Sequence, residues 1–217
     1  MPYRTIKQWP SKVLSRQSEL ASLEEIKSVS VDLIDTLRAV SGAGLAAPQI
    51  GISKKVMVVD TSKFDCDNPD KKINGSHYWI ISNPVITNQS GEWRWKEACL
   101  SVPIITPMVT RFETLTLEYD DLNGERKTLE LEAPLSLAVQ HEADHLEGKT
   151  ILDRVGKNSA FLYKRKIRKS ILKSIREQRE LEKIDEPKIG RPKKKAHLSA
   201  QEVKKRKKNR LRNQKKK

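Results

Sequence analysis

The pattern HExxH occupies residues 141–145, where the chain reads His-Glu-Ala-Asp-His. Residues four apart lie on the same face of a helix, so His141 and His145 can bind one divalent metal ion together. Glu142 follows the first histidine and is placed to act as a general acid or base beside that metal. Two histidines leave a catalytic site one protein ligand short, because such sites usually have three. The pattern therefore predicts a third ligand elsewhere in the chain.

Cys99 is our candidate for the third ligand, and it lies in the segment 97–101, which reads EACLS. A thiolate and two imidazoles would leave a fourth position open for water. This ligand set accepts Fe(II), Zn(II), Ni(II) or Co(II), so one divalent metal ion is expected without a choice among them. A further segment, 42–51, reads GAGLAAPQIG and contains the side-chain amide of Gln49.

In chain order the three segments read GxGLAAxQ, ExCLS and QHExDHLxG, and they resemble the three signature motifs of the peptide deformylases. A lone HExxH occurs by chance in many helices, whereas three motifs in family order are far more specific. The resemblance covers residues 3 to 155. It implies an enzyme that removes the formyl group from the N-formylmethionine of nascent polypeptides and releases formate.

The resemblance also assigns roles to residues of this chain. The metal ligands that it implies are Cys99, His141 and His145, with Fe2+ as the physiological ion. Glu142 would take a proton from the attacking water and deliver it to the leaving amine. The side-chain amide of Gln49 and the backbone N–H of Leu100 would form the oxyanion hole.

Five further positions match substrate-binding positions of the family: Gly44, Trp95, Leu137, Ala138 and Arg111. The first four match the pocket for the methionine side chain, and the arginine matches one near the substrate cleft. Spacing alone indicates that Leu137 and Ala138 are simple core residues, and they can have both roles. Arg111 is equally interpretable as a solvated strand arginine. Glu97 is expected to support a metal ligand rather than to bind the metal.

Ala98 is the one departure from the motifs, since the family usually has glycine before the metal-binding cysteine. If that position needs a positive φ, Ala98 is strained there, whereas one methyl group is tolerated if only close approach is needed. The ligands are unaffected in either case. The fit of a substrate near Leu100 depends on which condition holds.

The elements that must position these residues follow from hydrophobic spacing. An amphipathic helix is predicted over 23–40, ended by Gly42, and a metal-binding helix over 135–146. Strands are predicted over 55–60, 78–86, 92–98, 105–119 and 126–133, with a hairpin turn at 121–124 and a polar insertion over 61–77. This order predicts an α+β fold with mixed or antiparallel strands around a central metal-binding helix, as in the peptide deformylases.

Charge divides the chain, whose 217 residues carry a net charge of +15. Residues 154–217 contain 26 basic and 6 acidic residues, whereas residues 1–153 contain 17 and 22. We therefore expect a catalytic domain over 1–155, a basic amphipathic helix over 156–186 and a Lys/Arg-rich disordered tail over 187–217. Apolar residues predicted to share one stripe of the basic helix are Phe161, Leu162, Ile167, Ile171 and Ile175.

A strongly basic segment suits a polyanionic partner, and the resemblance implies docking on the ribosome. The candidate contacts are Lys164, Arg165, Lys193, Lys194, Lys205 and Arg206, and solvated charge without a partner is the alternative. A membrane is not expected, because the apolar stripe is short and lacks tryptophan. With Cys66 and Cys99 both expected to be reduced and no leader or transit pattern seen, we expect a cytoplasmic monomer in a bacterial or phage-infected cell.

Two other functions fit parts of the pattern. An HExxH zinc peptidase of the metzincin type would need histidine where Ile151 stands, and one of the gluzincin type would need a glutamate from the basic helix. Alternatively, the chain is a ribosome- or nucleic-acid-binding protein with a vestigial deformylase domain. Cys99 in its motif favours deformylase. Release of formate from formyl-Met peptides, against cleavage of an internal peptide bond, distinguishes these functions.

Overall fold

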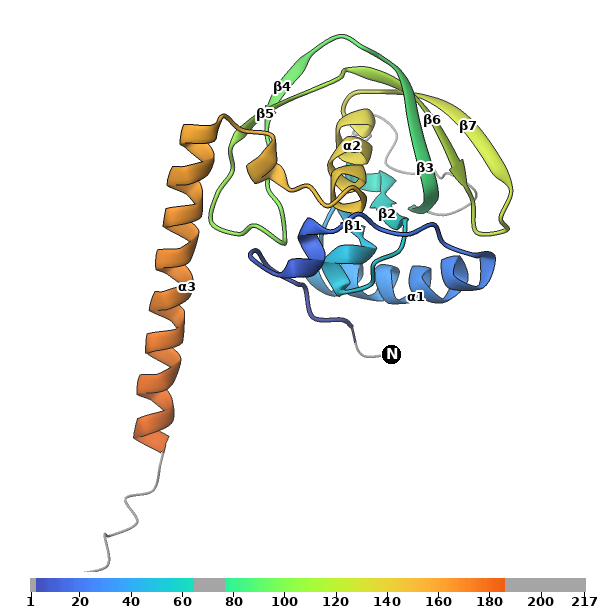
Figure 1. Ribbon diagram of the computed structural model, residues 1–217. Coiled ribbons are helices and arrows are strands. Elements are labelled where there is room, and N and C mark those ends of the chain that lie inside the picture. The colour runs from blue at the N-terminus through green and yellow to red at the C-terminus, as the bar shows by residue number, and fades with distance from the viewer. Residues whose placement is uncertain (1–2, 65–76, 186–217) are drawn as a thin grey trace, which may run out of the picture. The chain divides into compact units, whose positions relative to one another are not determined.

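The computed structural model describes residues 3–64 and 77–185, with side chains up to residue 179. Contacts divide the chain into a unit over Met1–Lys173 and a unit over Ser174–Lys217. The first unit combines helices with two antiparallel sheets, in agreement with the expected α+β fold (Figure 1). The predictions that lie outside the described residues concern Cys66, most of the polar insertion, the disordered tail, and Lys193, Lys194, Lys205 and Arg206.

The larger sheet has five antiparallel strands in the order β1-β2-β3-β6-β7, and β4 pairs with β5 in a separate two-stranded sheet. The strands are β1 (Gly44–Ala46), β2 (Val56–Asp60), β3 (Tyr78–Ser90), β4 (Trp93–Lys96), β5 (Met108–Arg111), β6 (Thr114–Asp120) and β7 (Arg126–Glu132). The helices are α1 (Leu23–Val40), α2 (Leu135–Leu146) and α3 (Lys157–Asp185). Short strand β1 was not predicted, since its three residues lie in a small-residue segment without a strand pattern.

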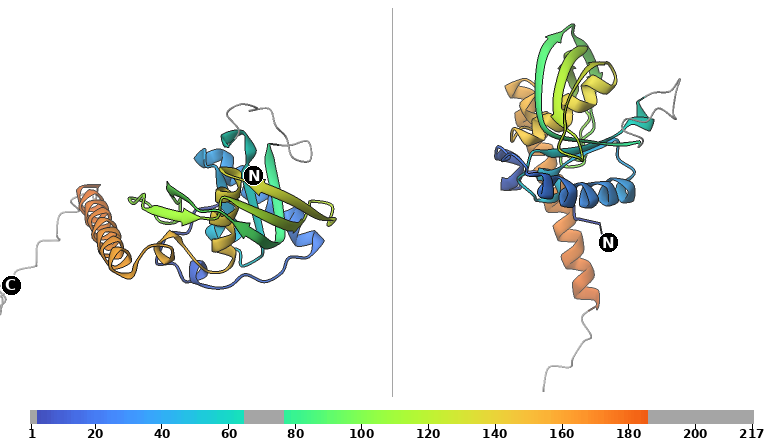
Figure 2. Two further views of the ribbon diagram at one scale, coloured as in Figure 1. Left: turned by 90° about the horizontal axis from the view of Figure 1, so that it is seen from above. Right: turned by 90° about the vertical axis from the view of Figure 1, so that its right-hand side faces the viewer.

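The apolar run of β2 is explained by helices on both faces of the sheet (Figures 1 and 2). Val56 and Val58 belong to the core cluster that contains the apolar side chains of α1. Met57 and Val59 belong to a second cluster, which contains the apolar side chains of α2. Because successive side chains of a strand point to opposite faces, a strand covered on both sides must be apolar throughout. The sheet therefore separates α1 from the metal-binding helix.

The expected continuous strand over residues 105–119 is wrong. The chain forms β5 and then β6, with a break at Phe112 and Glu113. β5 pairs with β4, whereas β6 pairs with β3 and β7 in the larger sheet. The chain must change direction where it passes from one sheet to the other, and side-chain alternation carries no sign of such a change.

α1 occupies the predicted residues, but a different residue ends it. At its start Ser22 and Glu25 form a capping box, in which each side chain accepts the backbone N–H of the other residue. At its end the left-handed residue is Ser41, with φ of 51°, and not Gly42. Gly42 is needed for space, because a Cβ there would lie 2.8 Å from Cδ1 of Leu37.

The first half of α3 belongs to the first unit and packs against its core. Ile167 is fully buried in a core cluster with Cys99 and Ile151, and Ile171 packs against the same cluster. The compact unit therefore runs to Lys173, beyond the boundary that we placed after residue 155. A change in charge marks where a chain becomes basic, but the apolar contacts decide where a folded unit ends.

The predicted apolar stripe of α3 is divided between two faces. Ile167 and Ile171 face the core, whereas Phe161 and Leu162 are 67% and 60% exposed and Ile175 is also exposed. A stripe read from one sequence mixes these faces because positions only one residue apart lie about 100° apart on a helix. In the described part of the chain, no helix is both long and apolar enough to cross a membrane.

Candidate active site

Cys99, His141 and His145 come together in the fold. One ligand atom from each lies within 4.8 Å of the others, and all three residues are buried. Sγ of Cys99 is 3.3 Å from Nε2 of His145. The histidines project from one face of α2, as their spacing predicts, and the cysteine follows β4 in a turn closed by the Val102 N–H and the Cys99 carbonyl.

Glu97 orients the first histidine. Its Oε2 is 2.7 Å from Nδ1 of His141, which leaves Nε2 of that ring for the metal. Arg111 holds the same carboxylate through two hydrogen bonds, from Nε at 2.6 Å and from Nη2 at 3.0 Å. Burial opposes the charge on Glu97, but these bonds keep its pKa far below the ordinary value. A charged carboxylate on Nδ1 fixes the imidazole tautomer and orientation that a metal ligand needs.

The donor atoms suit a metal in chemistry as well as in position. Burial by itself would raise the pKa of the Cys99 thiol, but the electrostatic interaction with His145 and hydrogen bonds with both histidines lower it to about 5. A lowered pKa favours the thiolate of Cys99, which is the form of cysteine that binds metals. Two nitrogens and a thiolate, together with the open space beside them, fit a divalent ion that keeps one position for water or substrate.

Glu142 lies beside this donor set without belonging to it. Its carboxylate is buried, its Oε2 accepts no hydrogen bond from the described residues, and burial raises the pKa of the carboxyl. Gly44 of β1 makes room for it, because a Cβ at position 44 would lie 2.6 Å from Oε1 of Glu142. Burial therefore favours the protonated form of Glu142 more than it would be favoured in water, which suits a carboxyl that takes up and returns a proton.

Gln49 is held so that its amide nitrogen faces the donor set. Its Oε1 accepts the Ala46 N–H at 2.7 Å, which turns Nε2 toward Sγ of Cys99, 3.9 Å away. Leu100 follows the cysteine and lines the cavity that Gln49 and Cys99 also line. An N–H donor held by such a contact needs little rearrangement to stabilise a negative oxygen in the site.

A cavity of about 640 Å³ opens onto these groups. Of the residues predicted to hold the methionine side chain, Gly44, Trp95 and Ala138 line this cavity, and Leu137 does not. Leu137 is fully buried, so the structure favours its interpretation as a core residue. Phe64 and Lys96 line the cavity although the sequence singled out neither, because both stand outside the three motifs.

Arg111 lies away from the predicted substrate cleft. It lines a different cavity, where its guanidinium is 2.6 Å from the carboxylates of both Glu97 and Asp144. It is only 4% exposed, so it is not a solvated strand arginine either. Strand alternation could not assign this position because β5 exposes one face to solvent and turns the other toward α2.

Ala98 is free of the strain considered above. Its φ lies outside the left-handed region. Among the described residues, the non-glycine residues with positive φ are Ser41, Asn83, Asn88 and Ile104. The methyl group is exposed and lines the cavity. The substitution for glycine therefore narrows the cavity beside Leu100 without distorting the backbone.

The buried histidine pair, the thiolate and the adjoining carboxylate, held by a helix against an antiparallel sheet, define a metallohydrolase. Residues 3–160 match the polypeptide deformylase family. The chain is 37% identical over 171 residues to a peptide deformylase of Acidobacterium capsulatum, covering 78% of this chain and 96% of that protein. A deformylase of Desulfotalea psychrophila is 34% identical over 76% of this chain and 94% of its own length.

Solved structures agree with this similarity. A peptide deformylase from Legionella pneumophila superposes with a TM-score of 0.69 at 31% identity, covering 81% of this chain and 99% of that chain. A peptide deformylase from Ehrlichia chaffeensis superposes with a TM-score of 0.70 at 30% identity, covering 80% of this chain and 99% of that chain. The chain belongs to the peptide deformylase family. It is an enzyme that hydrolyses the formyl group from N-formylmethionyl peptides, and the peptidase and vestigial alternatives are set aside.

Proposed function

We propose that the chain deformylates nascent polypeptides with Cys99, His141 and His145 as metal ligands and Glu142 as the proton carrier. The observation that carries this assignment is the opening of one cavity onto Cys99, His141 and Glu142 together. A divalent metal bound by these ligands supplies a Lewis acid that activates water and polarises the formyl carbonyl.

The protein's own groups perform the remaining steps. Glu142 takes a proton from the attacking water as its oxygen bonds to the formyl carbon. The same carboxyl then gives a proton to the leaving amine nitrogen as the C–N bond breaks, so the products are formate and a peptide with a free amino terminus. Gln49 and the Leu100 N–H donate hydrogen bonds to the oxygen that gains charge, which typically contributes a few kcal/mol per donor.

The methionine side chain occupies the part of the cavity formed by Gly44, Trp95 and Ala138. A deformylase of Acinetobacter baumannii has been solved with Met-Ala-Ser bound, and it superposes on this chain with a TM-score of 0.62 at 27% identity. A peptide that begins with methionine suits a cavity of this size and mainly apolar lining. Leu137 is a buried core residue outside the cavity lining, and Arg111 supports Glu97 beside the proposed metal site instead of the substrate.

Exchange of Glu142 for Gln tests the proton carrier. We expect bound metal to stay near the wild-type amount while kcat falls by roughly 100-fold or more, because an amide cannot carry the proton. Formate release and metal content are measured on the same preparation. The matched control is Glu147→Gln, which changes an exposed carboxylate at the end of the same helix. Retention of about a tenth of the activity would show that Glu142 is not the acid and base.

Iron is the metal that we propose for the enzyme in the cell. The thiolate of Cys99 and Fe(II) are both oxidisable, so the iron form should lose activity in air faster than the protein unfolds. The nickel form should keep its activity much longer under the same conditions. The measurement is residual formate release against time in air, with circular dichroism to follow unfolding. Equal half-lives for the two metal forms would contradict iron-based inactivation.

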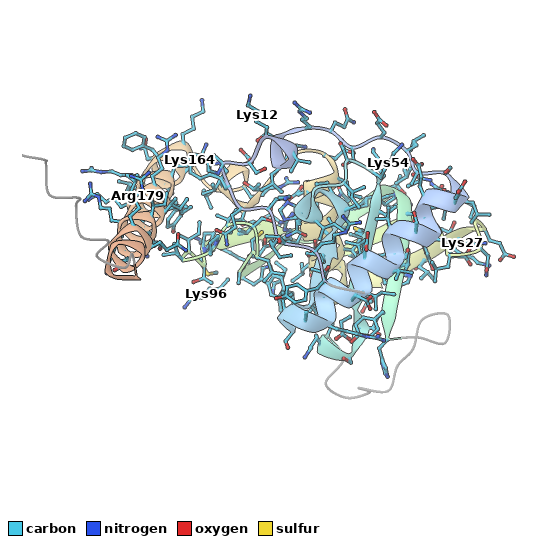
Figure 3. The ribbon with its side chains drawn as sticks, turned by 90° about the horizontal axis from the view of Figure 1, so that it is seen from below. Lys12, Lys27, Lys54, Lys96, Lys164 and Arg179 are labelled. Atoms are coloured by element: carbon cyan, nitrogen blue, oxygen red, sulfur yellow. The ribbon has the colours of Figure 1, made fainter. Side chains whose placement is uncertain are left out.

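The partner that we propose for the basic C-terminal part is ribosomal RNA, which would hold the enzyme where formylated chains emerge into the cytoplasm. Phe161, Leu162 and Leu172 are exposed on α3, and basic side chains lie between them, among them Arg165. Lys164 and Arg179 extend from the same helix (Figure 3). An exposed helix with mixed basic and apolar side chains suits a phosphate-rich surface with pockets for large side chains. We expect the enzyme to act there as a monomer.

A further inference from the structure

Asp144 and Arg154 are charged residues that the proposed reaction does not use. They line a cavity of about 380 Å³ that is distinct from the active-site cavity and has none of the three metal ligands in its lining. Asp144 is only 5% exposed, although ionised carboxylates are seldom buried without strong partners. The sequence motif contains Asp144 but assigns it no role, and Arg154 lies outside every motif.

These two residues end a continuous series of charged contacts that begins at a metal ligand. Nδ1 of His141 bonds to Glu97, and Glu97 accepts two hydrogen bonds from Arg111. Nη1 of Arg111 donates to Oδ2 of Asp144 at 2.6 Å. Arg154 then holds both oxygens of Asp144, with Nε at 2.8 Å from Oδ2 and Nη2 on Oδ1.

The charges in this series balance only when Arg154 is included. Glu97 and Asp144 bring two negative charges, and Arg111 and Arg154 bring two positive ones. The Glu97, Arg111 and Asp144 side chains are nearly completely buried, at 1%, 2% and 7% exposed. Without Arg154, the guanidinium of Arg111 would be the one positive partner of two buried carboxylates. This arrangement is strongly unfavourable, because a buried charge that loses its partner is left uncompensated.

We propose that Arg154 is a positioning residue for the metal centre, acting through Asp144, Arg111 and Glu97 on the orientation of His141. The guanidinium of Arg154 donates hydrogen bonds to both oxygens of Asp144. Asp144 then takes only Nη1 of Arg111, and Nε and Nη2 of Arg111 remain for Glu97. Glu97 in turn fixes the ring that presents Nε2 to the metal. Arg154 itself touches neither the metal ligands nor the active-site cavity.

An ordinary surface ion pair would not have this effect. Such pairs contribute little because both partners are solvated. Arg154 is 42% exposed, but its partner is buried and shared with a second arginine. Arg126 provides the comparison, since it is 40% exposed and also bonds to two carboxylates, those of Asp120 and Glu118 in the β6–β7 hairpin. None of these three residues lines either cavity.

The test compares Arg154→Gln and Arg154→Lys with the control Arg126→Gln in the full chain. Each protein is loaded with cobalt(II), its visible absorption is recorded, and the rate of cobalt loss to a chelator is measured without substrate. Substitutions that disturb the support of a metal ligand typically weaken metal binding by 10–100-fold. Arg154→Gln should therefore release cobalt roughly 10-fold faster or more, with a changed spectrum.

The other two variants sharpen the result. Arg154→Lys restores the charge without the two-pronged geometry, so its release rate should fall between those of the wild type and Arg154→Gln. Arg126→Gln should match the wild type in both spectrum and rate. The proposal would be overturned if Arg154→Gln had the same cobalt spectrum and the same release rate as the wild type. It would also be overturned if the only effect of Arg154→Gln were a lower melting temperature of the metal-free protein. No arm depends on deformylation, so failure here leaves the proposed reaction untouched.

Discussion

At the scale of single residues, Gly44 leaves the space in which the carboxylate of Glu142 lies. The two residues lie almost 100 positions apart in the sequence, yet the missing side chain of one provides the space for the carboxylate of the other. In the proposed reaction, the small-residue motif therefore does more than form a wall of the methionine pocket. It would also set the position of the proposed proton carrier, Glu142, relative to the proposed metal ligands.

Exchange of Gly44 for Ala should lower kcat while the protein keeps its metal. A Cβ at 2.6 Å from Oε1 of Glu142 must displace that carboxylate, whereas the three ligands are untouched. We expect a fall of roughly 10-fold or more, since a misplaced acid and base loses part of its 10²–10⁴-fold contribution. Formate release and metal content check this. Gly156→Ala is the control, because a Cβ there meets nothing within 4 Å. Equal kcat in the two variants would show that the Glu142 carboxylate can keep its function when a methyl group is added at position 44.

At the scale of elements, the position of α2 decides whether its two histidines meet Cys99. Its C-terminal end is held by Gly148, which has φ of 69° and approaches the backbone of Arg16. The Ser18 N–H also bonds to the carbonyl of Leu146. The N-terminal segment therefore crosses the end of the metal-binding helix at a distance that only glycine permits.

Exchange of Gly148 for Ala should destabilise the fold. A Cβ there would lie 2.8 Å from the carbonyl carbon of Arg16, and alanine is also disfavoured at positive φ. We expect a loss of about 1–3 kcal/mol in the free energy of unfolding. Urea denaturation of the metal-free protein measures it, and Gly156→Ala should stay within about 0.5 kcal/mol of the wild type. A Gly148→Ala protein of wild-type stability would mean that the crossing segment moves away easily.

At the scale of the whole molecule, residues 1–153 and residues 154–217 carry net charges of opposite sign. The first unit needs the first half of α3, because Ile167 and Ile171 complete a core cluster with Cys99. A truncation that removes the tail must therefore be placed well after these residues. A cut after Ile184 meets this condition and still removes the most basic segment of the chain.

Truncation after Ile184 should leave kcat/KM on a short formyl-Met peptide unchanged and weaken binding to ribosomes. Binding by the full chain should fall steeply with salt, because counterions are released when many lysines and arginines meet phosphates. The truncated protein should show a shallower dependence on salt. Sedimentation with ribosomes across salt concentrations checks both. Identical binding of the two proteins at every salt concentration would leave the tail as a solvated extension without this partner.

The sequence by itself determined the spans of α1 and α2 and the family, and it named the three candidate metal ligands that the structure brings together. His141, His145 and Cys99 were identifiable because helical spacing and short motifs are local properties of the chain. The same holds for the turn at residues 121–124, where Gly124 has φ of 79° and its N–H bonds to the carbonyl of Asp121. Such features need no knowledge of what packs against them.

Only the tertiary structure decided which faces and partners these elements have. Arg111 became an internal support of His141, since β5 lies against α2 and buries one of its faces. The strand predicted over 105–119 was divided between two sheets, and the apolar stripe of α3 between core and solvent. Each outcome depends on pairing between segments far apart in the chain, and side-chain periodicity contains no information about which neighbour will cover a face.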